Sequence, residues 1–273
     1  MKKRLSEIHP IFYYTRIWQK RFFRQLTDLP KTGKFASEKS AENLAFSVKK
    51  HQSLLRRKLG NSDPQLQENK ITNLKISCPT IDGILIKPNQ TFSFWHCVGE
   101  ATAAKGYAEG MQLSRGEVVR GVGGGLCQLA NLLYWMALHT PLKITERHHH
   151  SFDPFPDENR TLPFGSGAGV FYNYIDLRFF NPTNSTFQIK LWVTENHLKG
   201  SILTDIEPTE SFHVFEKEHR FLKHEGKNYR QNEIWREAID RRTGNRIREE
   251  ILGKNLAEVK YELNFEPQEC NLY

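Results

Sequence analysis

The stretch GVGGGLCQLANLLYWMALHTP, from Gly121 to Pro141, carries no formal charge and constrains the fold more than any other part of the chain. Its apolar residues continue around every side of a helix that spans residues 126–140, and such a helix lies inside a protein core. Pro141 ends the helix, because proline cannot continue the hydrogen-bond ladder. The sequence therefore predicts a buried central helix with other elements packed around it.

Two further helices are expected in the N-terminal region. The segment HPIFYYTRIWQKRFFRQL predicts an amphipathic helix that begins just after Pro10. A second helix is expected from Ser37, as N-cap, to Leu59, with Gly60 as its stop. The segment NSDPQLQENK, residues 61–70, is interpreted as a polar linker, and the pattern becomes β-rich from Ile71 onward.

Alternating residues and turn signals predict strands in the rest of the chain. They fall around a Pro-Asn turn within residues 81–95, at Glu117–Arg120, at Ile144–Glu146, in a hairpin formed by FQIKLWV and LKGSILT, and in AEVKYELNF near the C-terminus. We expect an α+β fold with a mixed or antiparallel sheet packed on the buried central helix. The predicted division is a basic helical N-terminal region (1–70), a central domain (71–205) and a β-rich C-terminal extension (206–273).

The net charge of +8 comes from the first quarter of the chain. Residues 1–70 carry about +10 and the remaining residues about −2. In the first helix, aromatic and aliphatic residues share one face and basic residues the other: Ile11, Tyr14, Trp18, Phe22 and Leu26 against Arg16, Lys20 and Arg24. Two interpretations stay open. Residues 10–27 bind an anionic membrane surface, or the helix docks on its own domain with its basic residues in solvent. No nucleic-acid partner is expected, because aromatic residues away from the positive charge do not suit base stacking.

The sequence shows no long apolar span and no apolar core of a signal peptide after its basic start. Four cysteines, without a C-x-x-C pair, indicate cytosolic thiols rather than a disulfide framework: Cys78, Cys97, Cys127 and Cys270. We therefore expect a location in the cytoplasm or on the inner face of the membrane. No cofactor and no metal are expected.

Cys127 follows the glycine run at the start of the central helix. The positive end of a helix dipole stabilises a thiolate, so a lowered pKa and a nucleophilic role are expected there. Glycines let the backbone approach a ligand closely. The N–H groups around Gly125–Gln128 are candidates for holding the oxyanion that forms when a thiolate attacks a carbonyl.

The segment ERHHHS follows the predicted strand that ends at Glu146. On an extended backbone His148 and His150 lie on one side, so either is a candidate general base, with Asp176 or Glu146 orienting its ring. Three alternatives stay open at this point. Cys127 is an inert part of the core, it forms a zinc site with His148 and His150, or the histidines form a solvated surface strip.

The segments KPNQTFSFW, KGYAEG, GGGLCQLANLLYWMALHTPLKITERHHHS and YIDLRFFNPTNSTFQIKL, in this order, resemble the VanW family. The resemblance runs from about Leu74 to Thr204. It implies a role in cell-wall peptidoglycan metabolism, because accessory members belong to B-type vancomycin resistance and larger exported relatives include cysteine L,D-transpeptidases.

The resemblance also assigns roles to residues. Cys127 matches the nucleophile, and Asp176 lies in a strand of the family pattern. The Glu-Arg-His-x-His-Ser pattern matches Glu146, Arg147, His148, His150 and Ser151, and the substrate-binding candidates are Gly123, Gly124, Gly125, Gln128, Glu146, Arg147 and Ser151. The implied reaction is acyl transfer from a peptidoglycan stem peptide or its precursor. A non-catalytic protein that binds such precursors or the membrane surface is the alternative.

Overall fold

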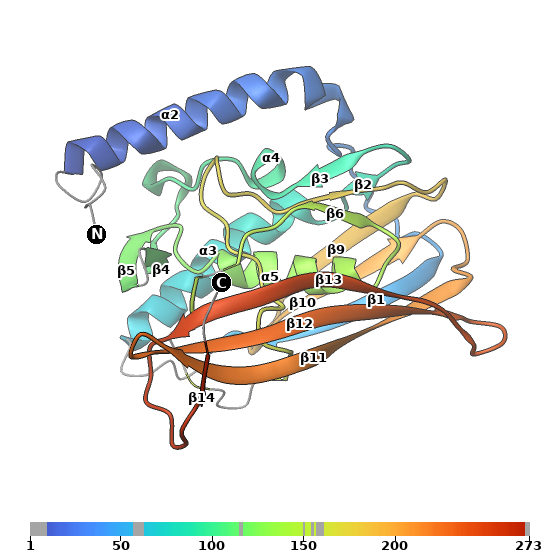
Figure 1. Ribbon diagram of the computed structural model, residues 1–273. Coiled ribbons are helices and arrows are strands. Elements are labelled where there is room, and N and C mark those ends of the chain that lie inside the picture. The colour runs from blue at the N-terminus through green and yellow to red at the C-terminus, as the bar shows by residue number, and fades with distance from the viewer. Residues whose placement is uncertain are drawn as a thin grey trace.

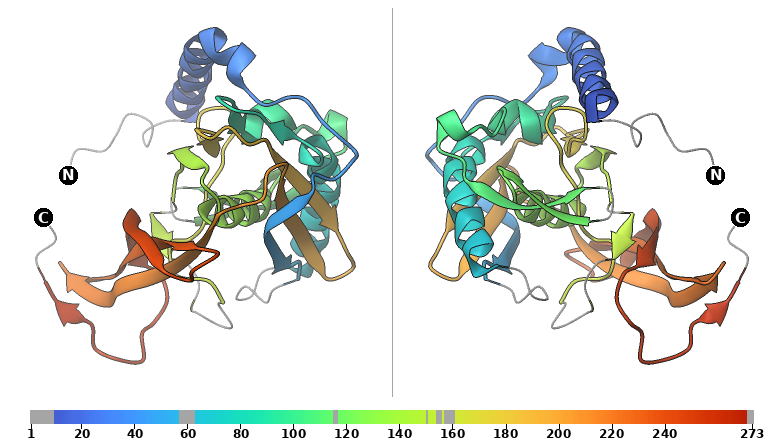
Figure 2. Two further views of the ribbon diagram at one scale, coloured as in Figure 1. Left: turned by 90° about the vertical axis from the view of Figure 1, so that its right-hand side faces the viewer. Right: turned by 90° about the vertical axis from the view of Figure 1, so that its left-hand side faces the viewer.

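The predicted central helix is present as α5 (Cys127–Leu138), and it lies between two sheets. The computed structural model describes residues 10–56, 63–114, 117–149, 151–153, 156 and 161–270. Helix α2 (Pro10–Asp28) runs along one edge of the molecule, and the C-terminal sheet lies along the opposite edge (Figures 1 and 2). This arrangement confirms the predicted α+β class with a buried central helix.

The sheets differ in strand order and length. The first sheet has the order β1-β10-β9-β2, with β1 (Phe46–Leu54), β10 (His197–Thr204), β9 (Phe187–Val193) and β2 (Leu85–Ile86). The C-terminal sheet has the order β14-β11-β12-β13-β7, with β14 (Gln268–Glu269), β11 (Glu210–His224), β12 (Lys227–Asp240), β13 (Arg246–Val259) and β7 (Phe152–Asp153). A three-stranded sheet joins β3 (Thr91–Ser93), β8 (Arg178–Phe180) and β6 (Lys143–Glu146). The hairpin of β4 (Glu109–Ser114) and β5 (Glu117–Val122) precedes α5.

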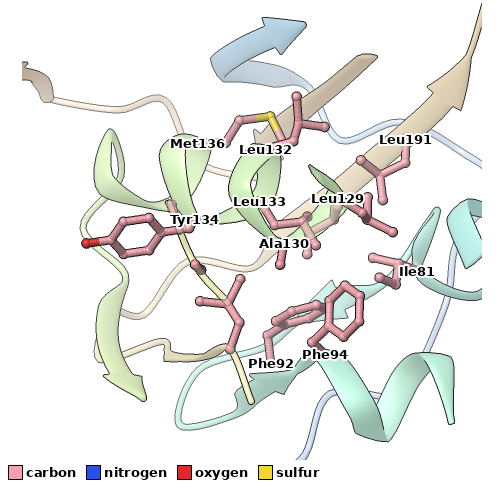
Figure 3. Packing of buried hydrophobic residues seen from close by; sticks show 14 of the residues in the cluster. Ile81, Phe92, Phe94, Leu129, Ala130, Leu132, Leu133, Tyr134, Met136 and Leu191 are labelled. Atoms are coloured by element: carbon pink, nitrogen blue, oxygen red, sulfur yellow. The ribbon is translucent and has the colours of Figure 1, made fainter. Parts of the chain in front are cut away.

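Helix α5 is buried along nearly its whole length. Its residues from Leu129 to Leu138 are buried except for Asn131, and Figure 3 shows Leu129, Leu133 and Met136 among side chains from other elements. A Cβ at Gly200 of β10 would lie 2.8 Å from Met136 Cε, so the Met136 side chain would have to shift to admit a larger residue in this strand. Arg236 of β12 donates to the carbonyl oxygens of Leu138 and Thr140 at 3.1 and 2.8 Å, which ties the end of α5 to the C-terminal sheet.

The helix predicted from Ser37 to Leu59 is wrong. Within its range the structure has the strand β1, which pairs antiparallel with β10. In β1, exposed and half-buried residues mostly alternate, and Leu55, which follows it, is fully buried. The helical spacing of Leu44, Val48 and Leu55 misled the prediction, because pairing with a distant strand decides the conformation here. Leu59 lies outside the described residues.

The interpretation of residues 61–70 as a linker and of Ile71 as the start of β structure is also wrong. Helix α3 spans Pro64–Ile81. The Asp63 carboxylate caps it by accepting a hydrogen bond from the Gln65 N–H at 2.9 Å, and Pro64 occupies the first turn, where its missing N–H has no cost. The other short helices are α4 (Phe94–Val98), η1 (Leu29–Lys34) and η2 (Ala103–Lys105).

The remaining strand predictions had mixed outcomes. The hairpin of β9 and β10, the strands β2 and β3 around the Pro-Asn turn, and β6 confirm the prediction. The strand predicted at Glu117–Arg120 is present as part of β5. In AEVKYELNF the strand ends at Val259, so the predicted alternation through Phe265 is wrong beyond that residue.

The division of the chain at residues 70 and 205 stays a prediction. Helix α3 continues through residue 70, and β1 shares a sheet with β10. Among the described helices, none has the length and hydropathy that crossing a bilayer requires.

Candidate functional site

Cys127 is the first residue of α5, as the sequence indicated. The residue is half-buried, and its Sγ lies 4.0 Å from the Val170 carbonyl oxygen, a long contact for a weak thiol donor. Burial raises the pKa of this thiol, against the opposite effect of nearby backbone hydrogen bonds. The direction is opposite to the lowered pKa that the helix terminus suggested. In this arrangement the thiol is protonated at neutral pH.

The glycine run before Cys127 is shaped by packing. Gly123 and Gly125 have φ angles of +75° and +92°, which side chains rarely adopt. A Cβ on Gly124 would lie 2.1 Å from the Gly110 carbonyl carbon of β4, so the two backbones touch at this point. Gly124 O also accepts a hydrogen bond from Asn73 Nδ2 at 2.9 Å. These glycines allow the turn to pack closely against β4 and α3.

Two backbone N–H groups at the start of α5 lack a hydrogen-bond acceptor in the part of the chain that the structure describes, which indicates a binding role. The N–H groups of Gly123, Gly124 and Gln128 donate to other carbonyl groups of the chain. Within the described ranges, the N–H groups of Gly125 and Leu126 have no acceptor. Unsatisfied N–H groups at a helix start can hold an anion or an oxyanion. The predicted cradle therefore includes these two N–H groups beside Cys127.

Glu146 is the carboxylate that contacts His148. Arg24 of α2 donates to it through both terminal nitrogens at 2.7 and 2.5 Å, and His148 Nε2 lies 3.2 Å from Glu146 Oε1. The Asp176 N–H also donates to it, at 3.1 Å. Burial alone would raise the pKa of Glu146, but the hydrogen bonds from His148 and Arg24 outweigh it and lower this pKa to about 2. Glu146, rather than Asp176, orients the ring of His148.

Asp176 is almost fully buried and serves the framework around the site. Its carboxylate accepts hydrogen bonds from Ser93 Oγ at 2.6 Å, from Arg178 Nε at 2.7 Å and from the Trp95 N–H at 3.1 Å. Burial raises the pKa of Asp176, while Ser93 and Arg178 act in the opposite direction. Its carboxylate makes none of its described hydrogen bonds to a histidine.

Arg147 and Gln128 are held by the protein itself. Arg147 Nε donates to the Gly167 carbonyl at 2.9 Å, Nη1 donates to Asn255 Oδ1 at 3.1 Å, and Nη2 donates to the Gly165 carbonyl. Gln128 Nε2 donates to the Leu54 carbonyl and to Ser53 Oγ, each at 2.8 Å. A substrate carboxylate bound by Arg147 would have to displace these contacts.

The other predicted residues of the histidine segment contribute less to the described geometry. Burial lowers the pKa of His149. Ser151 is exposed, and its carbonyl accepts from the Glu258 N–H at 3.1 Å. His150 lies outside the described residues, so its predicted role and the zinc alternative stay predictions. The described residues contain no group of three metal-ligating side chains.

Cys127 and His148 flank one segment of chain without touching. The Gly169 N–H donates to the His148 carbonyl at 2.7 Å, and the next residue, Val170, supplies the carbonyl beside Cys127 Sγ. The ring of His148 is directed to Glu146 instead. Among the described residues, no hydrogen bond joins Cys127 to His148.

The structure adds a cleft that the sequence did not predict. It has a volume of about 600 Å³ and lies between α2 and the His148 region, lined by Arg16, Gln19, Lys20, Phe23, Arg24, Thr27, His148, Tyr174 and Ile175. Lys20 Nζ lies 4.7 Å from the centre of the Tyr174 ring. The only sequence signal was the basic face of the first helix, which gave no indication of its partner.

The burial of the thiols predicts an order of iodoacetamide labelling. Burial raises the pKa of Cys78 and of Cys97 to about 12, so these two should label slowest at pH 8. Cys127 should label more slowly than a free cysteine, and half-exposed Cys270 fastest. Peptide mass mapping gives the four rates, and labelling in urea, where all should react alike, is the control. Fast labelling of Cys127 at pH 6–7 would contradict the enclosed thiol described above.

The fold and the site together define an α+β protein with a cysteine at the start of a buried central helix and a glutamate-bound histidine nearby. The family model described as VanW like protein matches residues 69–203. The chain is 33% identical over 207 residues to the vancomycin B-type resistance protein VanW of Enterococcus faecalis (strain ATCC 700802 / V583), covering 75% of each protein. This chain belongs to the VanW family.

A second relative is matched over a shorter stretch. The uncharacterized protein YoaR of Bacillus subtilis (strain 168) is 34% identical over 121 residues, which is 43% of this chain and 37% of that protein. No solved structure matches the chain. The family predicted from the motifs is thus confirmed, and its matched region includes Cys127, Glu146 and Asp176.

Proposed function

We propose that this protein acts in peptidoglycan metabolism linked to glycopeptide resistance, as a cysteine acyltransferase on stem peptides. Its relative in Enterococcus faecalis carries vancomycin B-type resistance in its name. One observation carries the catalytic part of the proposal. Cys127 opens a buried helix directly beside two N–H groups, of Gly125 and Leu126, that have no acceptor among the described residues.

The reaction proceeds in two acyl-transfer steps. The Cys127 thiolate attacks the carbonyl carbon of an L,D-peptide bond; a C–S bond forms, the C–N bond breaks, and the terminal D-amino acid leaves as an amine after taking a proton. The N–H groups of Gly125 and Leu126 stabilise the oxyanion. A second stem's amine, or water, then attacks the thioester and releases Cys127 as the thiol.

Because the Cys127 thiol is enclosed, this mechanism requires that a base gain access to Sγ. Burial raises the pKa of Cys127, and the Val170 carbonyl is its described polar neighbour. Substrate binding must displace the segment around Gly169 and Val170 so that a base reaches Sγ. His148, already fixed to Glu146 on the other side of that segment, is the described candidate.

The test compares Cys127→Ala with a matched variant, Cys270→Ala. A synthetic tetrapeptide stem ending in D-alanine serves as donor and a second stem peptide as acceptor. The expected result is release of D-alanine and a covalent adduct on Cys127 in the unaltered protein and in Cys270→Ala. Because the nucleophile is gone, Cys127→Ala should lose transfer by at least about 100-fold. Full transfer by Cys127→Ala, with intact circular dichroism, would overturn the catalytic proposal.

A second candidate is an accessory protein that binds stem peptides without turnover. The enclosed, protonated state of Cys127 and the structural contacts of Arg147 favour it. This candidate predicts equal affinity of Cys127→Ala and the unaltered protein for the tetrapeptide, with no adduct and no D-alanine released. Calorimetry beside the transfer assay distinguishes the two functions.

A further inference from the structure

Helix α2 docks on the rest of the protein through charged residues. The pairs Arg24–Glu146 and Asp28–Arg178 join it to β6 and β8, with bidentate contacts of 2.5 to 2.8 Å. We call these two pairs the ionic clasp. All four side chains of the clasp are less than one-fifth exposed. The sequence left open whether this helix docks or binds a membrane, and the structure shows docking with the polar side inward.

The large apolar side chains of α2, which lies along the edge of the molecule (Figure 1), consequently remain exposed. We call the residues Ile11, Trp18, Phe22 and Leu26 the outer face. Trp18 is 65% exposed and Leu26 is 46% exposed. The Trp18 and Phe22 rings stack in parallel with their centres 5.6 Å apart. A contiguous apolar surface of this kind marks an interaction site on a water-soluble domain.

The positive charge around the outer face favours an anionic binding partner. Asp28 is the single acidic residue of α2, and the ionic clasp binds it on the inner side. Arg16 and Lys20 are exposed on the same helix, and Lys31 and Lys34 are exposed just beyond it. Aromatic residues flanked by Arg and Lys suit the headgroup layer of an anionic bilayer. Two copies packed face to face would instead bring like charges together.

We propose that the outer face of α2 lies in the headgroup layer of an anionic membrane, and that the ionic clasp holds the rest of the protein against it. The inference does not depend on acyl transfer, since it rests on the helix alone. It places the cleft lined by Arg16, Lys20 and His148 beside the bilayer surface.

The test is co-sedimentation of the full chain with vesicles of phosphatidylcholine and 30% phosphatidylglycerol, against phosphatidylcholine alone. We expect binding at least about tenfold tighter to the anionic vesicles, from the basic residues near the surface. Trp18→Glu should weaken binding at least about tenfold, because it places a carboxylate in the apolar face. Trp192→Glu is the matched control: Trp192 is 44% exposed on β9, far from α2 in sequence, and should bind as the unaltered protein.

Three results would overturn the proposal. The first is equal vesicle binding by Trp18→Glu and the unaltered protein. The second is an equal loss in Trp192→Glu. The third is a dimer in vesicle-free buffer that Trp18→Glu converts to a monomer while vesicle binding stays the same, which would assign the outer face to a second copy. Urea denaturation of each variant verifies that the fold is retained.

Discussion

Asp176→Ala is expected to destabilise the protein by about 3–5 kcal/mol, a large share of the roughly 5–15 kcal/mol by which native proteins are stable. Asp176 is 1% exposed, and its loss leaves the Ser93 hydroxyl and the Trp95 N–H without their acceptor. It also removes one of the three described carboxylates that lie within 4.0 Å of the buried Arg178 guanidinium; the other two belong to Asp28 and Glu146. Unfolding in urea, followed by far-ultraviolet circular dichroism, gives the free energy of unfolding.

The control for this prediction is an exposed carboxylate. Glu38→Ala removes a pair with Lys87 in which both side chains are about half exposed, so a loss of no more than about 1 kcal/mol is expected. Asp176→Asn should lie between the two variants, because the amide oxygen still accepts hydrogen bonds, whereas the amide NH2 accepts none and the group carries no charge. A loss below about 1 kcal/mol in Asp176→Ala would show that its donors find other acceptors.

Gly124→Ala is the second substitution with a large expected effect, about 2–3 kcal/mol of stability. The φ angle of Gly124 is compatible with alanine, so the cost comes from contact alone. The new Cβ would lie 2.1 Å from the carbonyl carbon of Gly110 and 2.3 Å from its oxygen, both backbone atoms of β4. The turn before Cys127 must shift to relieve this overlap. Urea denaturation measures the loss, and the labelling rate of Cys127 reports the shift.

Gly253→Ala is the matched control. Gly253 lies in β13, and a Cβ there would meet no atom within 4 Å. We expect its free energy of unfolding to stay within about 0.5 kcal/mol of the unaltered protein. Equal stability of the two variants would mean that β4 moves away from the glycine turn at little cost.

The sequence predicted the elements whose conformation is set by their own residues. The charge-free run of α5 and the alternation of β9 and β10 are local signals, and both predictions were confirmed. β1 was predicted as a helix because its partner β10 lies about 150 residues further along the chain. The start of α3 was missed although its signal was present, since Asp63 followed by Pro64 is a strong helix start.

The residues of the candidate site also separate into those predicted from local sequence pattern and those placed by distant contacts. The positions of Cys127 at a helix start and of Glu146 at a strand end followed from local pattern. The contacts between Arg24 and Glu146 and between Asp28 and Arg178 join residues 122 and 150 positions apart. Since no local periodicity reports such pairs, the basic face of α2 was read as solvent-facing or membrane-facing, and its role in docking came only from the structure.

The ionic clasp also has a consequence for the order of events during synthesis. Arg178 is added to the chain 150 residues after its partner Asp28, which takes roughly 8–30 s at about 5–20 residues per second. Isolated helices form in about 1 μs. Throughout that interval α2 has an apolar face and no docking partner, so a nearby bilayer meets it before the folded protein does. Under the proposed membrane role of α2, the nascent chain is tethered by its first helix while the remaining domain is still being made.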